Sequence, residues 1–179
     1  MAFPRPKKRF YTEEELYEYA VGALGRRMRT VAELKRLFRA RVEEPESEYG
    51  RTLVELVIRR LKDRGYLNDS QYAAYFSSLR RDNQKFGRRR VITDLKVKGV
   101  HGDVIDKAVD AAFEGVSEEK QAREYLRRKR MAKPKDQKAT ARIFRQLVRA
   151  GFGTKTIFSI LKNWDVDEET LTQLESETA

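Results

Sequence analysis

One short pattern recurs along the chain and constrains its fold more than any other feature. It consists of two adjacent apolar residues, a leucine, a glycine four residues after that leucine, and a further apolar residue. Apolar residues at i, i+1 and i+4 line one face of a helix, and the glycine can take the left-handed conformation that ends it. The clear copies lie at 57–66, 91–100 and 143–152, and a weaker copy at 34–42 has Arg41 in place of glycine.

Repetition of this pattern predicts a helical repeat protein. The hydrophobic periodicity predicts about nine helices and no strand, so we expect an all-α, elongated array of tandem three-helix repeats. Pro45 and Pro134 fall between predicted helices, where proline is tolerated. The expected divisions are a basic arm at 1–11, repeats at 12–66, 67–115 and 116–164, and an acidic tail at 165–179 that we expect to fray.

The charge of the chain is strongly uneven. The net charge is +11, and the last 15 residues hold six acidic and no basic residues, so residues 1–164 carry +17. A body this basic favours a polyanionic partner, with nucleic acid ahead of an anionic membrane. A solvated surface of lysine and arginine is the alternative.

Several classes of function have little support in the sequence. The chain has no cysteine, which excludes disulfides and thiolate chemistry, and its one histidine, His101, lies in a break between helices. No phosphate-binding loop or nucleophile motif occurs. We expect no catalytic, cofactor or metal site and no enzymatic activity. No apolar run approaches the ~18 residues of a membrane span, and no secretory signal begins the chain, so we expect a soluble cytoplasmic protein.

Clusters of basic residues are the best indication of function. One cluster ends the first predicted helix, a second fills the junction between two helices of the second repeat, and a third runs through the start of the third repeat. A cation at the C-terminal end of a helix is favourable, so Arg26–Arg29 is explained equally well by the helix dipole. The triplet 88–90 precedes or opens a helix, where cations are unfavourable, and this favours contact with phosphate or with an acidic partner. The candidate DNA- or filament-binding residues are Arg26, Arg27, Arg29, Lys85, Arg88, Arg89, Arg90, Arg123, Arg127, Arg128, Lys129 and Arg130.

Two further features have alternative interpretations. Tyr72, Tyr75 and Phe76 could stack on bases, but their helical spacing favours core packing. Trp164 closes the last apolar stripe and is expected to cap the core. The acidic tail either screens the basic body or mimics DNA, or it is a solubilising end.

Four short motifs, in order, resemble the bacterial RecX family. The match spans residues 12–163, and each motif alone is weakly specific. The matching residues are Leu16-Tyr17, Ala20, Arg29-Thr30 and Glu33-Leu34; Gly65-Tyr66-Leu67-Asn68-Asp69 with Tyr72-Ala73; Lys98-Gly99-Val100 with Ile105; and Arg149-Ala150-Gly151-Phe152 with Ile157.

The resemblance implies a curved monomer of three-helix repeats that binds the filament of RecA on single-stranded DNA. It implies inhibition of filament extension, recombination and the RecA ATPase, without a catalytic site of its own; capping, disassembly and activation are not distinguished. The DNA backbone, single- or double-stranded, and the RecA surface compete as partners of the basic residues. A sequence-nonspecific helical DNA-binding module without a RecA partner is the alternative.

Overall fold

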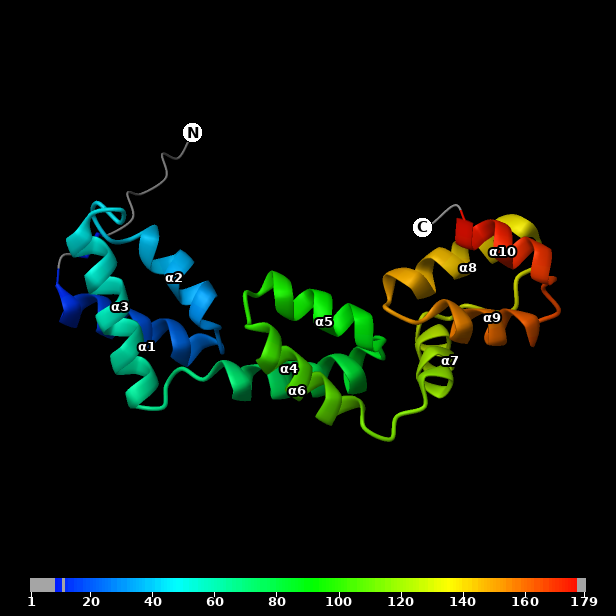
Figure 1. Cartoon of the computed structure of the whole chain (residues 1–179), viewed down its shortest axis with the longest axis horizontal. Helices are drawn as coiled ribbons and strands as arrows, with labels where there is room; N and C mark the ends of the chain where they lie inside the picture. The colour runs from blue at the N-terminus through cyan, green and yellow to red at the C-terminus, as the bar shows by residue number, and fades with distance from the viewer. Residues whose placement is uncertain (1–8, 11, 177–179) are drawn as a thin grey trace. The chain divides into compact units, whose positions relative to one another are not determined.

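The computed structural model describes residues 9, 10 and 12–176, and over these residues the protein is all-helical apart from one isolated bridge between Phe10 and Val42 (Figure 1). The prediction of an all-α fold is confirmed. Most of the predicted basic arm lies outside the described residues. The helices are α1 (Glu13–Arg26), α2 (Val31–Arg39), α3 (Glu48–Asp63), α4 (Asp69–Gln84), α5 (Arg88–Val97), α6 (Gly102–Phe113), α7 (Glu118–Arg128), α8 (Gln137–Arg149), α9 (Thr154–Lys162) and α10 (Glu168–Ser176).

The chain forms two compact units. Unit 1 comprises the chain up to Tyr72 together with Val97–Val104, and unit 2 comprises Ala73–Lys96 together with the chain from Ile105. The repeat boundaries expected from the sequence stay a prediction. None of the described helices is long and apolar enough to cross a bilayer.

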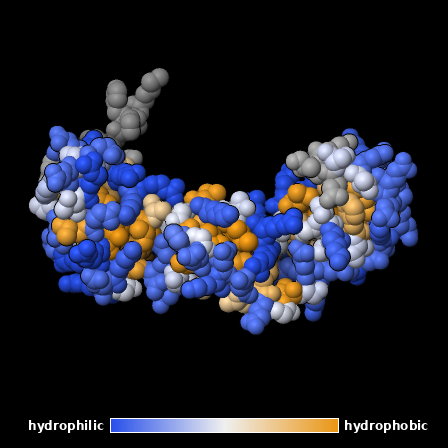
Figure 2. Space-filling model, viewed as in Figure 1, coloured by the Kyte–Doolittle hydropathy of each residue, from blue (hydrophilic) through white to orange (hydrophobic). Residues whose placement is uncertain are grey.

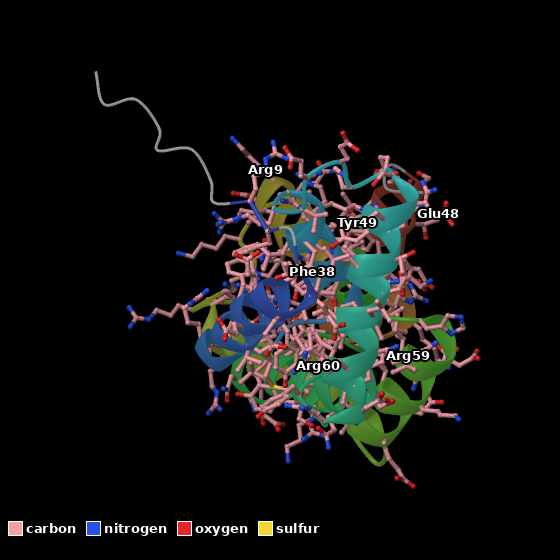
Figure 3. All side chains as sticks on the ribbon, turned by 90° about the vertical axis from the view of Figure 1, so that its left-hand side faces the viewer. Arg9, Phe38, Glu48, Tyr49, Arg59 and Arg60 are labelled. Atoms are coloured by element: carbon pink, nitrogen blue, oxygen red, sulfur yellow. The ribbon has the colours of Figure 1, made fainter. Side chains whose placement is uncertain are left out.

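Unit 1 is organised around one apolar core between α1, α2 and α3. Thr30 begins α2 with a capping box, in which its hydroxyl accepts from the Glu33 backbone and the Glu33 carboxylate accepts from the Thr30 backbone. Phe38 is fully buried and lies among these helices (Figure 3). Most of this core comes from the apolar faces of the three helices, with Phe10, Val42 and Leu67 added from outside them; it comprises Phe10, Leu16, Tyr17, Ala20, Leu34, Phe38, Val42, Leu53, Val54, Val57, Ile58, Leu61 and Leu67.

The glycines of the recurring pattern end helices as predicted. Gly65, Gly99 and Gly151 have φ of +74°, +75° and +89°, which is the left-handed region that suits glycine. At the copy that lacks glycine the chain ends α2 differently. Arg41 is not left-handed, and its carbonyl instead accepts a hydrogen bond of 2.9 Å from the backbone of Phe10.

Unit 2 has its main core between α7, α8, α9 and α10. Tyr125, Phe144 and Phe152 are among its largest buried side chains, and Trp164 packs against it as expected. The acidic tail differs from expectation, because α10 forms there and adds a tenth helix. Leu171 is fully buried, and Leu174 belongs to the same core.

The aromatic residues of α4 have divided roles. Tyr72 and Phe76 are buried, in agreement with core packing. Tyr75 is 59% exposed, so core packing was the wrong interpretation for that ring. The apolar stripe of α4 is narrower than the spacing of its aromatics indicated.

Candidate nucleic-acid interface

Helix α8 has opposite apolar and cationic faces. Asp136 caps its N-terminus by accepting a hydrogen bond of 2.6 Å from the backbone of Ala139. The buried face carries Ile143, Phe144 and Leu147. The other face carries four cations at i, i+4, i+7 and i+11, a spacing that places them along one side of the helix. We call these residues the α8 stripe: Lys138, Arg142, Arg145 and Arg149.

The α8 stripe has no acidic partner in the part of the chain that the structure describes. Lys138, Arg142 and Arg149 are exposed and Arg145 is half-buried. Among the described residues, no carboxylate forms an ion pair with any of the four. Like charges three or four residues apart weaken a helix, so the packing of the apolar face must hold α8 together. The stripe extends for about 16 Å at 1.5 Å per residue, which spans several phosphates of a nucleic-acid strand.

The C-terminal end of α8 adjoins the N-terminus of α5. The backbone N–H groups of Gly87 and Arg89 donate to the carbonyls of Ala150 and Gly151, at 2.8 and 3.3 Å. Arg90 Nη1 donates to the Arg149 carbonyl at 3.5 Å. Carbonyls at the negative end of α8 thus face the arginine-rich start of α5, which reduces the penalty for cations at that helix N-terminus.

Two of the three arginines at the start of α5 have acidic partners within unit 2. Arg88 forms an ion pair with Asp110, and Arg90 Nε lies 2.9 Å from Asp94. The Arg89 side chain is exposed, and no carboxylate of the described residues pairs with it. Of the triplet, Arg89 is therefore the most available for an external anion.

The remaining candidates in unit 2 also differ in whether they pair with a carboxylate. Lys85 lies 2.9 Å from Glu124, and its hydrogen bond and charge hold the pKa of that carboxyl below its ordinary value. Arg123 pairs with Glu119 at 2.5 Å, one turn earlier on α7. Lys129 Nζ lies 5.9 Å from the centre of the Tyr125 ring, a cation–π contact.

Three candidates remain exposed near the end of α7 without an ion pair among the described residues: Arg127, Arg128 and Arg130.

The candidates in unit 1 have local structural roles. Arg29 Nε donates to the Ala23 carbonyl at 3.4 Å, near the C-terminal end of α1. Arg27 lies 3.8 Å from Glu33, and Arg26 is exposed in the last turn of α1. These contacts agree with the helix-dipole explanation that the sequence left open.

A groove lies beside the N-terminal half of α8. Its volume is about 660 Å³, and the loop that follows α7 forms one of its walls. Five basic residues and one acidic residue, Asp136, line it. The cations are Lys129, Arg130, Lys133, Lys135 and Arg142. Because Arg142 belongs to both, the groove and the α8 stripe are continuous.

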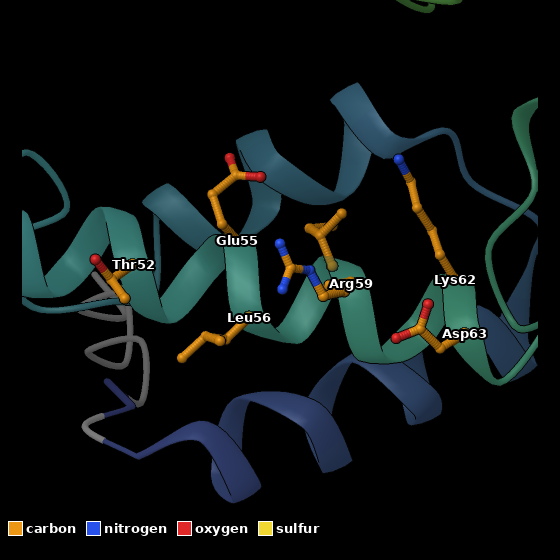
Figure 4. A pocket seen from close by; sticks show the side chains of 7 residues that line it. Thr52, Glu55, Leu56, Arg59, Lys62 and Asp63 are labelled. Carbon is orange, nitrogen blue, oxygen red and sulfur yellow. The ribbon is translucent and has the colours of Figure 1, made fainter.

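A second pocket, on the outer face of α3 in unit 1, has a different character. It measures about 450 Å³, and its lining includes Leu56 together with Glu55, Arg59, Lys62 and Asp63 (Figure 4). The two acidic and two basic side chains give it no preference for a polyanion. Figure 3 looks onto this end of unit 1, with Tyr49 and Arg59 on α3.

The described part of the chain contains no cluster of metal-ligating side chains. No group of three or more histidine, aspartate and glutamate side chains there could hold a metal ion. The His101 side chain is 80% exposed and 3.8 Å from Asp103, and no other acid of the described residues lies within ion-pair distance of it. Hydrophilic residues cover most of the visible face of the C-terminal part of unit 2, with apolar residues between them (Figure 2).

The chain is similar to known proteins over nearly its whole length. It is 34% identical over 162 residues to the regulatory protein RecX of Deinococcus radiodurans, covering 88% of this chain and 72% of that protein. The chain belongs to the RecX family. The RecX regulatory protein of Mycolicibacterium vanbaalenii is 31% identical over 142 residues, covering 75% of this chain and 74% of that protein. The resemblance found in the sequence motifs is confirmed.

A domain model and two crystal structures of RecX also match this chain. Residues 68–109 match the model of the second three-helix domain of RecX. The crystal structure of RecX from Lactobacillus salivarius superposes with a TM-score of 0.61 at 18% identity, covering 86% of this chain and 96% of that chain. A second crystal structure of regulatory protein RecX gives a TM-score of 0.61 at 20% identity, covering 84% of this chain and 71% of that chain. The helical architecture is therefore that of RecX.

Sequence reasoning missed the α8 stripe. It selected runs of adjacent cations, whereas the α8 stripe is dispersed between apolar residues. The signal was nevertheless present, because the cations at 138, 142, 145 and 149 follow the helical period opposite the apolar stripe. A search for cationic periodicity would have found them.

Proposed function

We propose that this RecX-family protein binds the filament that RecA forms on single-stranded DNA and inhibits filament extension and RecA-dependent ATP hydrolysis. The proposal rests on membership of the RecX family, because the relatives from Deinococcus radiodurans and Mycolicibacterium vanbaalenii are named regulatory proteins. In this proposal the protein acts by occupying the filament and has no catalytic step of its own. It works in the cytoplasm as a monomer.

The basic surface of unit 2 is the part that we assign to the DNA backbone. The observation that carries this assignment is the α8 stripe, four cations on one helix face that no described carboxylate neutralises. Guanidinium and ammonium groups bind phosphate through charge-assisted hydrogen bonds, and such contacts position a protein without reading sequence. We include in this surface the exposed, unpaired residues Arg89, Arg127, Arg128 and Arg130.

The other sequence candidates contribute less to DNA contact in this proposal. Lys85, Arg88, Arg90 and Arg123 already hold a carboxylate, so a phosphate would have to replace that partner. The exposed ring of Tyr75 remains available for stacking on a base.

The test is RecA-dependent ATP hydrolysis on single-stranded DNA with this protein added at up to one copy per RecA subunit. We expect hydrolysis to fall in a dose-dependent way. A rate that stays unchanged at the stoichiometric dose would overturn the proposal.

The second candidate function is a sequence-nonspecific DNA-binding module that has no RecA partner. The α8 stripe also favours this function, since phosphate contacts alone do not require RecA. Capture of RecA in the absence of DNA separates the two. Tight, salt-sensitive binding of DNA with no capture of RecA, free or filamentous, would favour the module.

A further inference from the structure

An acidic segment adjoins the basic groove of unit 2. Lys133, in the loop after α7, forms an ion pair with Asp165, which follows α9. A smaller cavity of about 430 Å³ continues from this pair; it is lined by Lys133, Lys135 and Asp136 on one side and by Asp165 and Asp167 on the other. The carboxylates thus lie at the edge of the groove that carries the cations.

Helix α10 keeps this segment in place. Leu171 and Leu174 are buried in the core of unit 2, and α10 contacts α8 and α9. In Figure 1 the red α10 lies beside the gold α8. Lys162 pairs with Glu168 at 2.9 Å, which adds a second connection between α9 and α10. The acidic residues that begin the tail are therefore held close to the groove by a folded helix.

The ion pair itself contributes little to stability. The side chains of Lys133 and Asp165 are 54% and 84% exposed. Exposed pairs are weak, because water and salt screen them. Lys133 can therefore exchange one anion for another. The hydrogen bond and the charge of Lys133 lower the pKa of Asp165, so the carboxylate is ionised at neutral pH.

We propose that the groove continues the nucleic-acid path of the α8 stripe, and that the Asp165 carboxylate occupies at Lys133 the position of a backbone phosphate of the bound strand. This inference deepens the proposed function and rests on it. Arg142 connects the two parts, since it belongs to the stripe and lines the groove. A strand that enters the groove displaces Asp165 from Lys133, so the acidic segment weakens binding to DNA.

The decisive variant is Asp165→Asn. Asp165 has φ of +61°, and asparagine accepts this left-handed conformation at least as well as aspartate, so the turn is retained. Asp106→Asn is the matched control: it makes the same chemical change at an exposed residue of α6 that lines no described groove. The measurement is the fluorescence anisotropy of a labelled 20-nucleotide oligo(dT), without RecA, across a series of salt concentrations.

We expect Asp165→Asn to bind oligo(dT) about 3- to 10-fold more tightly at low salt. The slope of the logarithm of the binding constant against the logarithm of the salt concentration should steepen by about 0.7, the value for one added phosphate contact on a single strand. Asp106→Asn should shift affinity by less than about 2-fold, because its charge acts at a distance and is screened. In the double variant with Lys133→Met, the gain from Asp165→Asn should disappear.

The outcomes separate this inference from the proposed function. Equal affinities for Asp165→Asn and Asp106→Asn, with the wild-type protein binding oligo(dT), would overturn the inference and leave the proposed function intact. A gain that survives Lys133→Met would also overturn it. A wild-type protein that binds no oligo(dT) even at low salt would contradict the assignment of the basic surface of unit 2 to DNA.

Discussion

The backbone nitrogen of Arg90 lies where a side chain of Gly151 would be: a Cβ built on Gly151 would come within 2.2 Å of that atom. Two copies of the recurring pattern meet here, since Arg90 lies in the first turn of α5, the helix of one copy, and Gly151 follows the end of α8, the helix of another. The absence of a side chain lets the turn after α8 accept hydrogen bonds from the start of α5. This contact also brings Arg89 and Arg90 to the end of the α8 stripe.

Replacing Gly151 by alanine should therefore destabilise unit 2 strongly. The left-handed φ costs alanine about 1 kcal/mol, and the clash with a backbone atom requires α5 to move, so we expect a total loss of about 3 kcal/mol or more. Gly115→Ala is the control, because Gly115 is also left-handed but a Cβ there meets no atom within 4 Å. Urea unfolding followed by the fluorescence of Trp164, the sole tryptophan, reports on unit 2 in both variants. Equal losses would contradict the proposed close approach.

Removing cations from the α8 stripe should weaken DNA binding without unfolding the helix. Alanine is the best helix former, and loss of like charges relieves repulsion along α8. For Arg142→Ala with Arg145→Ala, we expect the logarithmic salt slope on single-stranded DNA to fall by about 1.4, the loss of two phosphate contacts. Arg59→Ala, at an exposed position of α3, should leave the slope unchanged. An unchanged slope in the double variant would exclude the stripe as a phosphate track.

Helix α10 should contribute measurably to the stability of unit 2. Leu171 is fully buried, and truncation of a buried leucine to alanine typically costs about 2–5 kcal/mol. We expect Leu171→Ala to lower the urea midpoint of Trp164 fluorescence. Thr172→Ala, at the exposed neighbouring position, should change it little. A midpoint that does not respond to Leu171→Ala would show that the tail is frayed, as the sequence suggested.

Two carboxylates in unit 1 should shift the pH dependence of stability in opposite directions. Burial raises the pKa of Glu33, but hydrogen bonds from Lys98 and the Thr30 backbone, with the charges of Lys98 and Arg27, outweigh it, so the net pKa lies below the ordinary value. The stabilising contribution of the Glu33 carboxylate is present above the ordinary pKa and is lost as pH falls. Burial raises the pKa of Asp69 despite its hydrogen bond from the Val31 backbone, so its ionisation opposes folding as pH rises.

We therefore expect Glu33→Gln to lower stability at pH 7 by on the order of 1 kcal/mol, a value reduced by solvent screening, and to flatten the loss of stability between about pH 5 and 3. Asp69→Asn retains an oxygen for the Val31 backbone, so it should preserve stability at pH 7 and steepen the acid loss. The measurement is urea unfolding by far-UV circular dichroism at several pH values. Parallel profiles for wild type and both variants would contradict these assignments.

Local signals in the sequence were sufficient for most of the fold. The stripes, the capping box at Thr30 and the glycines at 65, 99 and 151 each act within one helix or turn, so their effect can be read from neighbouring residues. The termination of α2 at Arg41 could not be read in this way, because it depends on pairing with Phe10. Tyr75 was assigned to the core since spacing alone does not give the width of a buried face.

The candidate interface was less predictable because it depends on tertiary pairing. Arg88 and Lys85 were selected as free cations, yet their partners Asp110 and Glu124 lie 22 and 39 residues further along the chain. Only the folded chain shows which cations already hold a carboxylate. The same comparison identifies the α8 stripe, because its four cations have no acidic partner among the described residues.

The most direct test of the central claim is co-sedimentation of this protein with RecA filaments assembled on single-stranded DNA. Wild-type protein should pellet with the filaments, and the variant with Lys138→Ala, Arg142→Ala and Arg145→Ala should stay largely in the supernatant. Arg88→Ala, where the arginine already pairs with Asp110, should lose much less binding. Wild-type protein that remains in the supernatant, or an α8 variant that pellets as well as wild type, would contradict the account.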